Sequence, residues 1–408
     1  MKCKQSTALV FIFLAIFIDF MSGSMIIPIL PYIIEHYRSD ALTVGLLEAS
    51  FFLAIFIASP LLGSLSDRFG RRPVLLWSTF GTAIGCTIFG LANSLVWLFV
   101  GRILDGITGG FLSTAQAYIA DISKREDRAK NFGLLGAAFG LGFILGPVVG
   151  GLLVQVNLNL PILTAATLAL FNTIFGFFAL PESLSVENRR SFKVADLNPF
   201  SQVFDLISHA LIGYLVIAFL IFNLSFAGFQ TNIAVLTRDR FHWTPGDNAI
   251  LFAYIGLVSS IVQGGLLRII LNRFSEKQVA ITGLAFAGIA LVWIAMGVRE
   301  VGFYFAVGVF ASGVGLCMPT LRGLISSGAS EQEQGKVMGA TQALVSITMI
   351  FGPLWAGFSF DHFGFATPYW TGAILVFIAW RVMNFSVKRS VHSSVFNSSK
   401  IVVENLEK

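Results

Sequence analysis

Four ionisable side chains of this sequence lie inside long apolar stretches, where a charge is costly and usually has a function. They are the carboxylic acids Asp19, Glu48 and Asp105 and the guanidinium of Arg102. A carboxylic acid in an apolar cavity holds its proton more tightly than it does in water, so it can load and release protons near neutral pH. Asp19 lies in the middle of its stretch. These residues therefore indicate reversible proton binding within a membrane, with Asp19 as the first candidate.

The other three groups admit more than one interpretation. Arg102 and Asp105 are three residues apart, so they share a helix face and can form an ion pair. That pair could take part in proton binding, or it could be a self-neutralised pair that only braces the helices. Glu48 lies near the end of its stretch and could equally be a solvated end residue. The second half of the chain has no acid inside its apolar stretches, so we expect proton handling in the first half.

The elements that carry these residues are predicted to be membrane-spanning helices. Of the 408 residues, 55% are hydrophobic and only 12% are charged, whereas soluble domains have roughly a quarter charged residues. A helix needs about 20 apolar residues to cross the hydrocarbon core. Twelve runs of suitable length occur, near 8–34, 43–64, 74–93, 96–119, 131–154, 160–180, 209–236, 247–270, 278–298, 301–325, 336–358 and 368–386. We therefore expect an all-α integral membrane protein with twelve transmembrane helices.

An internal repeat divides these helices into six and six. GPVVGG at 146–151 recurs 206 residues later as GPLWAG at 352–357, and NRFSEK at 272–277 takes the place of DRFGRR at 67–72. The predicted organisation is an amino-terminal six-helix bundle (1–180), a cytoplasmic central loop (181–207), a carboxyl-terminal six-helix bundle (208–390) and a cytoplasmic tail (391–408). Transporters built from parallel repeats of this kind bind their substrate near mid-membrane, between the halves.

The basic residues predict the orientation. If the amino terminus and every second loop are counted as cytoplasmic, most of the 27 Lys and Arg residues lie on that side, and only Arg38, Arg238, Arg240 and Arg299 lie in loops on the other. Because positive residues in short loops stay inside, both termini are expected to be cytoplasmic. The net charge of +5 is then an orientation signal, and it gives no reason to expect nucleic acid as a partner.

No cluster typical of an enzyme or a metal site is evident. The three cysteines are too few and too scattered for a disulfide framework or a metal site, and the five histidines lie at predicted span ends or in loops. We expect a protein that is not an enzyme, has no metal or organic cofactor, and uses the proton as its coupling ion. A transport-inactive receptor or an intramembrane enzyme is the more distant alternative, which detectable solute flux by the purified protein would exclude.

The turn between the second and third spans, GSLSDRFGRR at 63–72, has the most informative spacing. Gly63 and Asp67 are one helical turn apart, where a glycine allows close approach of another helix. Gly70 suits a tight turn. Asp67 is well placed to cap the electropositive start of the eleventh span, near Lys336. The alternative is an ordinary charged turn whose arginines only set the orientation.

This turn resembles the signature loop of the major facilitator superfamily, GxLxDRxGRR. The matching residues are Gly63, Leu65, Asp67, Arg68, Gly70, Arg71 and Arg72. The resemblance implies the major facilitator fold and a cytoplasmic gate that locks the two bundles together when the cavity faces outward. Arg102 and Gly106 likewise resemble the family's fourth-helix RxxxG motif, whose arginine takes part in proton coupling. Asp105 stands where that motif more often has an uncharged residue, which leaves open whether Arg102 serves Asp105, Asp19 or Glu48.

The fifth span carries a signal for the direction of transport. In GFILGPVVGG at 142–151, three glycines at intervals of four share one face, and Pro147 removes a backbone donor and bends the helix. Such glycine-rich packing is also common in membrane helices of no special function. The string resembles the gxxxGPxxGG signature of the antiporter branch of the same family, which implies export against a proton. The matching residues are Gly142, Gly146, Pro147, Gly150 and Gly151.

The second half offers uncharged polar side chains for a substrate cavity, namely Asn223, Gln230, Asn232, Gln263 and Gln342. Together with aromatic walls, drawn from 41 Phe, a few amides suit an amphipathic organic molecule. Residues 226–267 and LPESL at 180–184 resemble tetracycline-type exporters. The resemblance implies a monomeric, multi-pass protein of the cell (inner) membrane that exports a small drug-like compound in exchange for protons by alternating access. The alternative is a symporter or facilitator of the same fold that imports a metabolite.

Overall fold

The computed structural model describes residues 2–38, 40–123, 128–189, 212–328 and 334–384. The described chain is helical throughout, without strands, and eleven of its helices are long and apolar enough to cross a membrane. Residues 367–384 are also helical as far as the description reaches, in the place of the predicted twelfth span. The expectation of an all-α membrane protein is confirmed. The predicted central loop is described only up to residue 189, and the predicted tail lies outside the described residues.

The bounds of the helices follow the apolar runs closely. In the first half they are α1 Lys2–Ile26, α2 Leu30–Glu35, α3 Ala41–Phe69, α4 Arg71–Gly90, α5 Leu95–Gly109, α6 Leu112–Ile122, α7 Arg128–Val154 and α8 Leu160–Ala179, followed by the 3-10 turn η1 Val186–Asn188. In the second half they are α10 Gly213–Phe241, α11 Pro245–Ile261, the π-helical turn η3 Val262–Leu266, α12 Leu267–Leu271, α13 Glu276–Ala295, α14 Glu300–Ser327 and α15 Gln334–Phe363.

Three predicted spans are not continuous α-helices, which corrects the sequence-based bounds. The run 8–34 divides into α1 and α2, because Pro28 supplies no backbone N–H and disfavours helix in the residue before it. The run 96–119 divides into α5 and α6 at Gly109 and Gly110, and 247–270 passes through η3 at Gly264 and Gly265. Paired glycines lower helix propensity enough for the hydrogen-bond pattern to change there.

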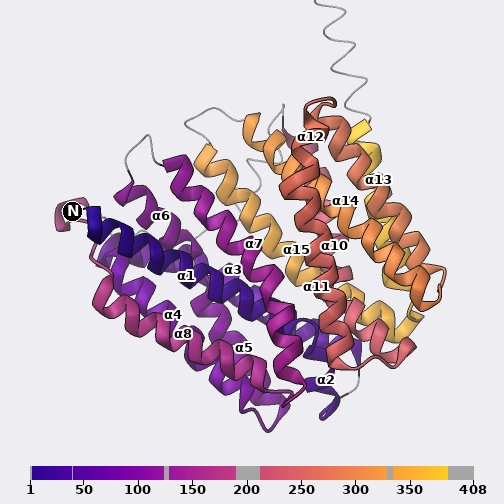
Figure 1. Ribbon diagram of the computed structural model, residues 1–408, viewed down its shortest axis with the longest axis horizontal. Coiled ribbons are helices and arrows are strands. Elements are labelled where there is room, and N and C mark those ends of the chain that lie inside the picture. Colours follow the sequence, from indigo (N-terminus) through magenta and orange to yellow (C-terminus); the bar gives the residue numbers. More distant parts are fainter. Residues whose placement is uncertain (1, 39, 124–127, 190–211, 329–333, 385–408) are drawn as a thin grey trace, which may run out of the picture.

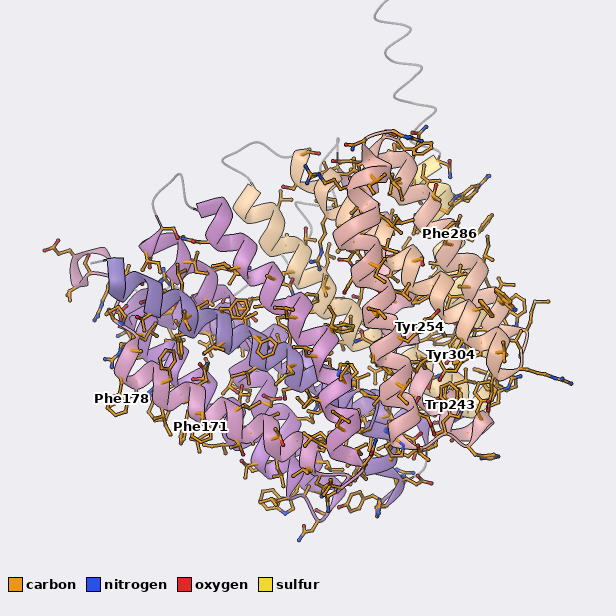
Figure 2. The ribbon with its side chains drawn as sticks, in the orientation of Figure 1. Phe171, Phe178, Trp243, Tyr254, Phe286 and Tyr304 are labelled. Carbon is orange, nitrogen blue, oxygen red and sulfur yellow. The ribbon has the colours of Figure 1, made fainter. Side chains whose placement is uncertain are left out.

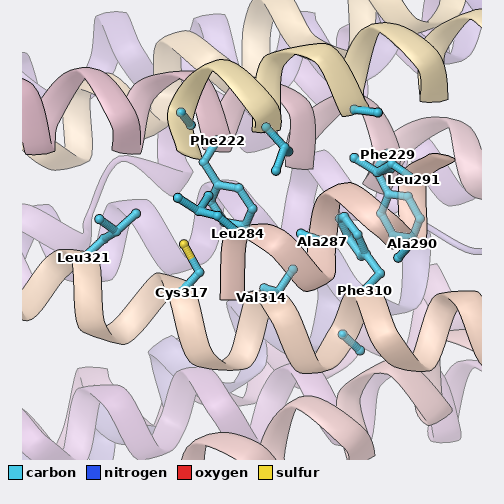
Figure 3. Close-up of a cluster of buried hydrophobic side chains, with 14 of the residues drawn as sticks. Phe222, Phe229, Leu284, Ala287, Ala290, Leu291, Phe310, Val314, Cys317 and Leu321 are labelled. Atoms are coloured by element: carbon cyan, nitrogen blue, oxygen red, sulfur yellow. The ribbon is translucent and has the colours of Figure 1, made fainter. Parts of the chain in front are cut away.

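The two halves lie side by side (Figure 1). The second half has one large apolar core, whereas the first half has several smaller clusters, one of which also includes Val235 of α10. Figure 3 shows part of the core of the second half, where Phe222, Leu284, Phe310 and Leu321 pack together and are almost fully buried. Many other aromatic side chains, such as Phe171 and Phe178, point away from the bundles (Figure 2). Such outward aromatic side chains are suited to contact with lipid.

The two halves meet mainly along two helix pairs, α3 with α15 and α7 with α11, and α10 also contacts α2 and α3. The hydrogen bonds that we identify between the halves cluster at one end of the molecule, near α2 in Figure 1, which we call the sealed end. There Tyr32 donates from its hydroxyl to the Trp243 carbonyl (2.5 Å) and accepts from Asn248 Nδ2 (2.7 Å). Arg238 Nη1 also donates to the Pro31 carbonyl (3.1 Å). The start of α4 and the end of α3 lie at the opposite end, which we call the signature end.

Candidate functional site

A buried ion cluster joins α3 to α5. Arg102 Nη2 lies 2.8 Å from Glu48 Oε1, and Arg102 Nη1 lies 3.8 Å from Asp105 Oδ2. The three side chains are 3%, 6% and 9% exposed, so water screens these charges little. Glu48 is therefore an interior residue in this structure, and it is closer to the guanidinium than Asp105 is.

Glycines make this close helix packing possible. A Cβ added to Gly85 of α4 would lie 2.8 Å from the Asp105 amide nitrogen, and one added to Gly106 would overlap the Phe51 carbonyl oxygen. The guanidinium of Arg102 also lies over the ring of Phe51, 4.0 Å from its centroid, a favourable cation–π geometry. The first half thus holds its arginine by packing as well as by charge.

Asp19 of α1 lies within electrostatic range of this cluster. It is partly exposed, and it interacts electrostatically with both Asp105 and Arg102. Three acids therefore lie within electrostatic range of one guanidinium, which contacts Glu48 and Asp105 directly. If all three were ionised, two negative charges would remain uncompensated between apolar helices, and uptake of a proton would reduce that charge.

Some polar atoms of the cluster are left without hydrogen-bond partners among the described residues. They are Arg102 Nε and Nη1 and Asp105 Oδ1, all buried. Buried polar atoms normally have partners. These atoms therefore give the cluster free capacity to bind water, a proton carrier or a polar group of a bound molecule.

The signature turn forms a second site, about Arg71, at the signature end. Arg71 pairs with Asp67 on its own half, and its Nε lies 3.3 Å from Asp121 Oδ2 of α6. Gly70 has φ of 110°, a conformation that glycine adopts readily. Arg68 is exposed beside the ring of Phe69, whereas Arg72 donates from Nη2 to the Phe177 carbonyl (2.7 Å). An open cavity of about 790 Å³ adjoins this turn and is lined by Gly63, Asp67, Arg71, Ser113, Ala117, Asp121, Leu184, Glu187 and Arg189.

Glu182, in the LPESL segment after α8, is a residue of this site that the sequence reading missed. Its carboxylate accepts hydrogen bonds from the amides of Arg71 (2.8 Å) and Arg72 (3.2 Å), the first residues of α4. It also accepts from the amides of Ser183 and Leu184 in its own segment. Because Gly70 precedes α4 and has no side chain with which to cap it, Glu182 acts as the cap from a distant part of the chain.

The glycines of the α7 signature face two different neighbours. A Cβ on Gly142 would lie 2.8 Å from the Phe17 carbonyl oxygen of α1. A Cβ on Gly146 would lie 2.7 Å from the Met21 carbonyl oxygen of the same helix. Gly150 also faces α1, at Met25, whereas a Cβ on Gly151 would lie 2.7 Å from Ala249 Cβ of α11, in the other half. Pro147 lies inside the continuous helix α7. This signature therefore packs α7 against its own bundle on one side and against the opposite bundle at its end.

The uncharged candidates of the second half are dispersed. Asn223 and Asn232 are buried. Asn223 donates to the Phe219 carbonyl within its own helix α10 (2.7 Å), whereas Asn232 donates to the Ala356 carbonyl of α15 (3.3 Å) and so joins two helices. The other three candidates are partly or fully exposed: Gln230, Gln263 and Gln342. Gln263 lies in the π-helical turn η3.

The sequence model of one family matches this chain. The model is that of the Major Facilitator Superfamily, and it matches residues 12–353 and 269–400. Together with the helical membrane fold, this match defines the class of protein. The chain belongs to the Major Facilitator Superfamily and is a multi-pass membrane transporter, not an enzyme.

Similar proteins include tetracycline and multidrug resistance proteins. The chain is 36% identical over 354 residues to the tetracycline resistance protein, class C, of Escherichia coli, covering 86% of this chain and 89% of the relative. It is 29% identical over 367 residues to multidrug resistance protein 2 of Bacillus subtilis (strain 168), covering 88% and 90%.

Solved structures support the same fold. The human organic anion transporter MFSD10 (TETRAN) matches with a TM-score of 0.71 at 23% identity, covering 93% of this chain and 99% of that one. A bacterial homologue of the human lysosomal transporter Spinster, in an inward-facing and unoccupied conformation, matches with a TM-score of 0.76 at 14% identity, covering 94% and 97%.

Proposed function

We propose that this transporter exports a small amphipathic organic compound, of the tetracycline or multidrug type, in exchange for protons and by alternating access. The substrate class rests on the relatives named as tetracycline and multidrug resistance proteins. The direction rests on the α7 glycine signature, which resembles that of antiporters. The transporter works as a monomer in the cell (inner) membrane with both termini in the cytoplasm, which makes the signature end the cytoplasmic end.

The observation that carries the proposed coupling is that three acids lie within electrostatic range of one guanidinium. Asp19 is its accessible member, whereas Glu48 and Asp105 are buried beside Arg102. A proton on Asp19 lowers the excess negative charge, and loss of that proton restores it. The free-energy cost of closing the cavity around Asp19 is therefore lower when Asp19 is protonated than when it is ionised. A proton driven by 100 mV supplies about 2.3 kcal/mol, enough for roughly a fifty-fold gradient of a neutral solute.

Reconstituted protein tests this proposal. In proteoliposomes with tetracycline as the probe, Asp19→Asn is expected to abolish pH-driven counterflow while substrate binding stays measurable. Glu300→Gln is the matched control, because Glu300 is an exposed acid in the first turn of α14. It should transport like the wild type. If Asp19→Asn transports with an unchanged response to pH, the coupling role assigned to Asp19 is wrong.

The direction of proton movement tests the antiport step separately. A pH-sensitive dye inside the vesicles should report protons moving opposite to the substrate. Protons moving with the substrate would identify a symporter, and substrate flux without proton movement would identify a facilitator.

A further inference from the structure

The end of α15 repeats the pattern of the signature turn. GSLSDRFG at 63–70 and GFSFDHFG at 357–364 share Gly, Asp, Phe and Gly at the same four positions. Each string closes a long helix, since α3 ends at Phe69 and α15 ends at Phe363. The final glycine has positive φ in both, 110° at Gly70 and 96° at Gly364. This likeness is separate from the 206-residue repeat, which places residues 272–277 opposite the signature.

The two helices that end in this pattern are antiparallel neighbours. Leu42 of α3 lies beside Gly357 of α15, and Gly45, further along α3, lies beside Pro353, further back along α15. The start of α3 therefore meets the end of α15 at the sealed end. At the signature end, the end of α3 is directed towards the start of α15.

At the sealed end the α15 pattern is engaged with the other half. Asp361 accepts hydrogen bonds from the Ala41 amide at Oδ1 (3.0 Å) and from the Leu42 amide at Oδ2 (2.7 Å). These amides belong to the first turn of α3, whose N–H groups have no partner within the helix. Gly357 permits the approach, because a Cβ there would lie 2.5 Å from the Ala41 carbonyl oxygen.

At the signature end, the described residues that lie beside Gly63 and Asp67 belong to the same half as they do. Asp67 pairs with Arg71, and the nearest described neighbour of a Cβ added to Gly63 would be Ser113 Oγ, 3.7 Å away and in the same half. Gly339, near the start of α15, is exposed. Among the described residues, the signature glycine and aspartate therefore make no close helix contact of the kind that Gly357 and Asp361 make.

We propose that Asp361 is a second carboxylate latch, and that Asp361 and Asp67 act in alternation at opposite ends of the α3–α15 pair. In the conformation described here, Asp361 caps α3 across the interface and holds the sealed end shut. In the opposite conformation Asp67 caps α15, and Asp361 releases Ala41 and Leu42 to water. A tilt of two packed helices that brings one pair of ends together separates the other pair, so the latches engage one at a time. This inference rests on the proposed alternating access.

Distance measurements between spin labels in the full-length protein test the inference. In a cysteine-free background, one label pair would replace Asn93 and Met296, which are exposed at the sealed end of the two halves. A second pair would replace Val186 and Gln278 at the signature end. Because charge-assisted hydrogen bonds across the interface are lost, Asp361→Asn should raise the ratio of sealed-end-open to sealed-end-closed molecules about five- to thirty-fold. Asp67→Asn should shift the same ratio in the opposite direction.

Asp40→Asn is the matched control. Asp40 caps the same helix start by accepting from the Thr43 amide (2.7 Å), but it does so within one half. It should leave the ratio unchanged. The proposal is overturned if Asp361→Asn leaves the sealed-end distances unchanged, if Asp40→Asn shifts them as much, or if Asp361→Asn and Asp67→Asn shift them in the same direction.

A second variant keeps the test decisive if Asp361→Asn does not fold. Gly357→Ala retains the carboxylate but places a methyl group against the Ala41 carbonyl, and it should open the sealed end in the same direction. Gly136→Ala, where an added Cβ meets nothing within 4 Å, is its control. An unchanged ratio in Gly357→Ala would overturn the proposal.

Failure of the latch and failure of the proposed exporter are distinguishable. If the protein transports tetracycline with proton coupling but the distances do not respond to Asp361→Asn, only the latch proposal is refuted. If the distances respond as predicted but tetracycline is not transported, only the proposed export function is refuted.

Discussion

Replacement of Glu182 by Ala should loosen the start of α4 without unfolding the protein. The carboxylate caps the amides of Arg71 and Arg72 from a segment more than a hundred residues away. Loss of a helix cap costs roughly 0.5 to 2 kcal/mol, and loss of a negative charge at a helix amino terminus costs roughly 0.3 to 1 kcal/mol. Glu182 is exposed, so water partly replaces the lost bonds. We therefore expect a local destabilisation of about 1 to 2 kcal/mol.

Hydrogen–deuterium exchange is the suitable assay, because it reports local opening that a global melting curve averages out. A destabilisation of this size should speed amide exchange in peptides covering residues 70–73 by about five- to thirty-fold. Glu182→Gln retains acceptor oxygen but loses the charge, and it should give a smaller increase. Peptides from α13, at the same end of the other half, should exchange as in the wild type.

Glu187→Gln is the control for a general effect of charge. Glu187 lines the same cavity as Arg71 but is not bonded to the start of α4 in the described structure. If Glu182→Ala leaves exchange at residues 70–73 unchanged, or if Glu187→Gln raises it equally, the capping role derived from the geometry is refuted.

Two further substitutions test the packing and charge of the first half. Gly146→Ala should lower the free energy of unfolding by about 1 to 3 kcal/mol, because its methyl group would meet Ser24 and Met21 of α1. Gly140→Ala, whose added methyl group would meet nothing within 4 Å, should be nearly neutral. Thermal melting in detergent compares the two variants, and equal melting temperatures would contradict the expectation. Glu48→Ala should cost about 3 to 5 kcal/mol by leaving Arg102 with only its longer contact. Adding Arg102→Leu should recover part of that loss, and an additive double variant would show that the pair does not interact.

The membrane explains why so much of the fold could be predicted from sequence alone. A chain inside lipid must satisfy its backbone within each helix, so every span appears as an apolar run of predictable length. The interruptions at Pro28, Gly110 and Gly264 were not predicted, because proline and glycine also occur inside continuous membrane helices, as Pro147 and Gly106 do here. Gly106, four residues before Gly110, packs against Phe51 inside a continuous helix. Only the neighbouring helix distinguishes these two roles.

For the sites, the sequence identifies the charged residues inside the membrane spans but not all of their contacts. Charges inside apolar runs are rare, so Asp19, Glu48, Arg102 and Asp105 could be selected without a structure. The contact between Arg102 and Asp105 follows from their spacing on one helix, but the shorter contact with Glu48 could not be inferred, since Glu48 and Arg102 are 54 residues apart on different spans. Glu182 gave no such signal, because a glutamate in a polar segment is ordinary until the start of α4 lies beside it.

The pattern at 357–364 shows how partner geometry changes the meaning of a motif. In the internal repeat, residues 67–72 of the signature turn have their counterpart at 272–277, but Ser275 there caps α13 by accepting from the Gln278 amide, which is a local role. In the α3–α15 helix pair, the counterpart of the signature lies at the end of α15. The two helices are antiparallel, so the carboxyl end of each helix lies on the same side of the molecule as the amino end of the other. A translational repeat conserves position within a bundle, whereas a latch requires positions that face each other across the interface. The functional partner of the signature is therefore to be sought in the helix that packs against it.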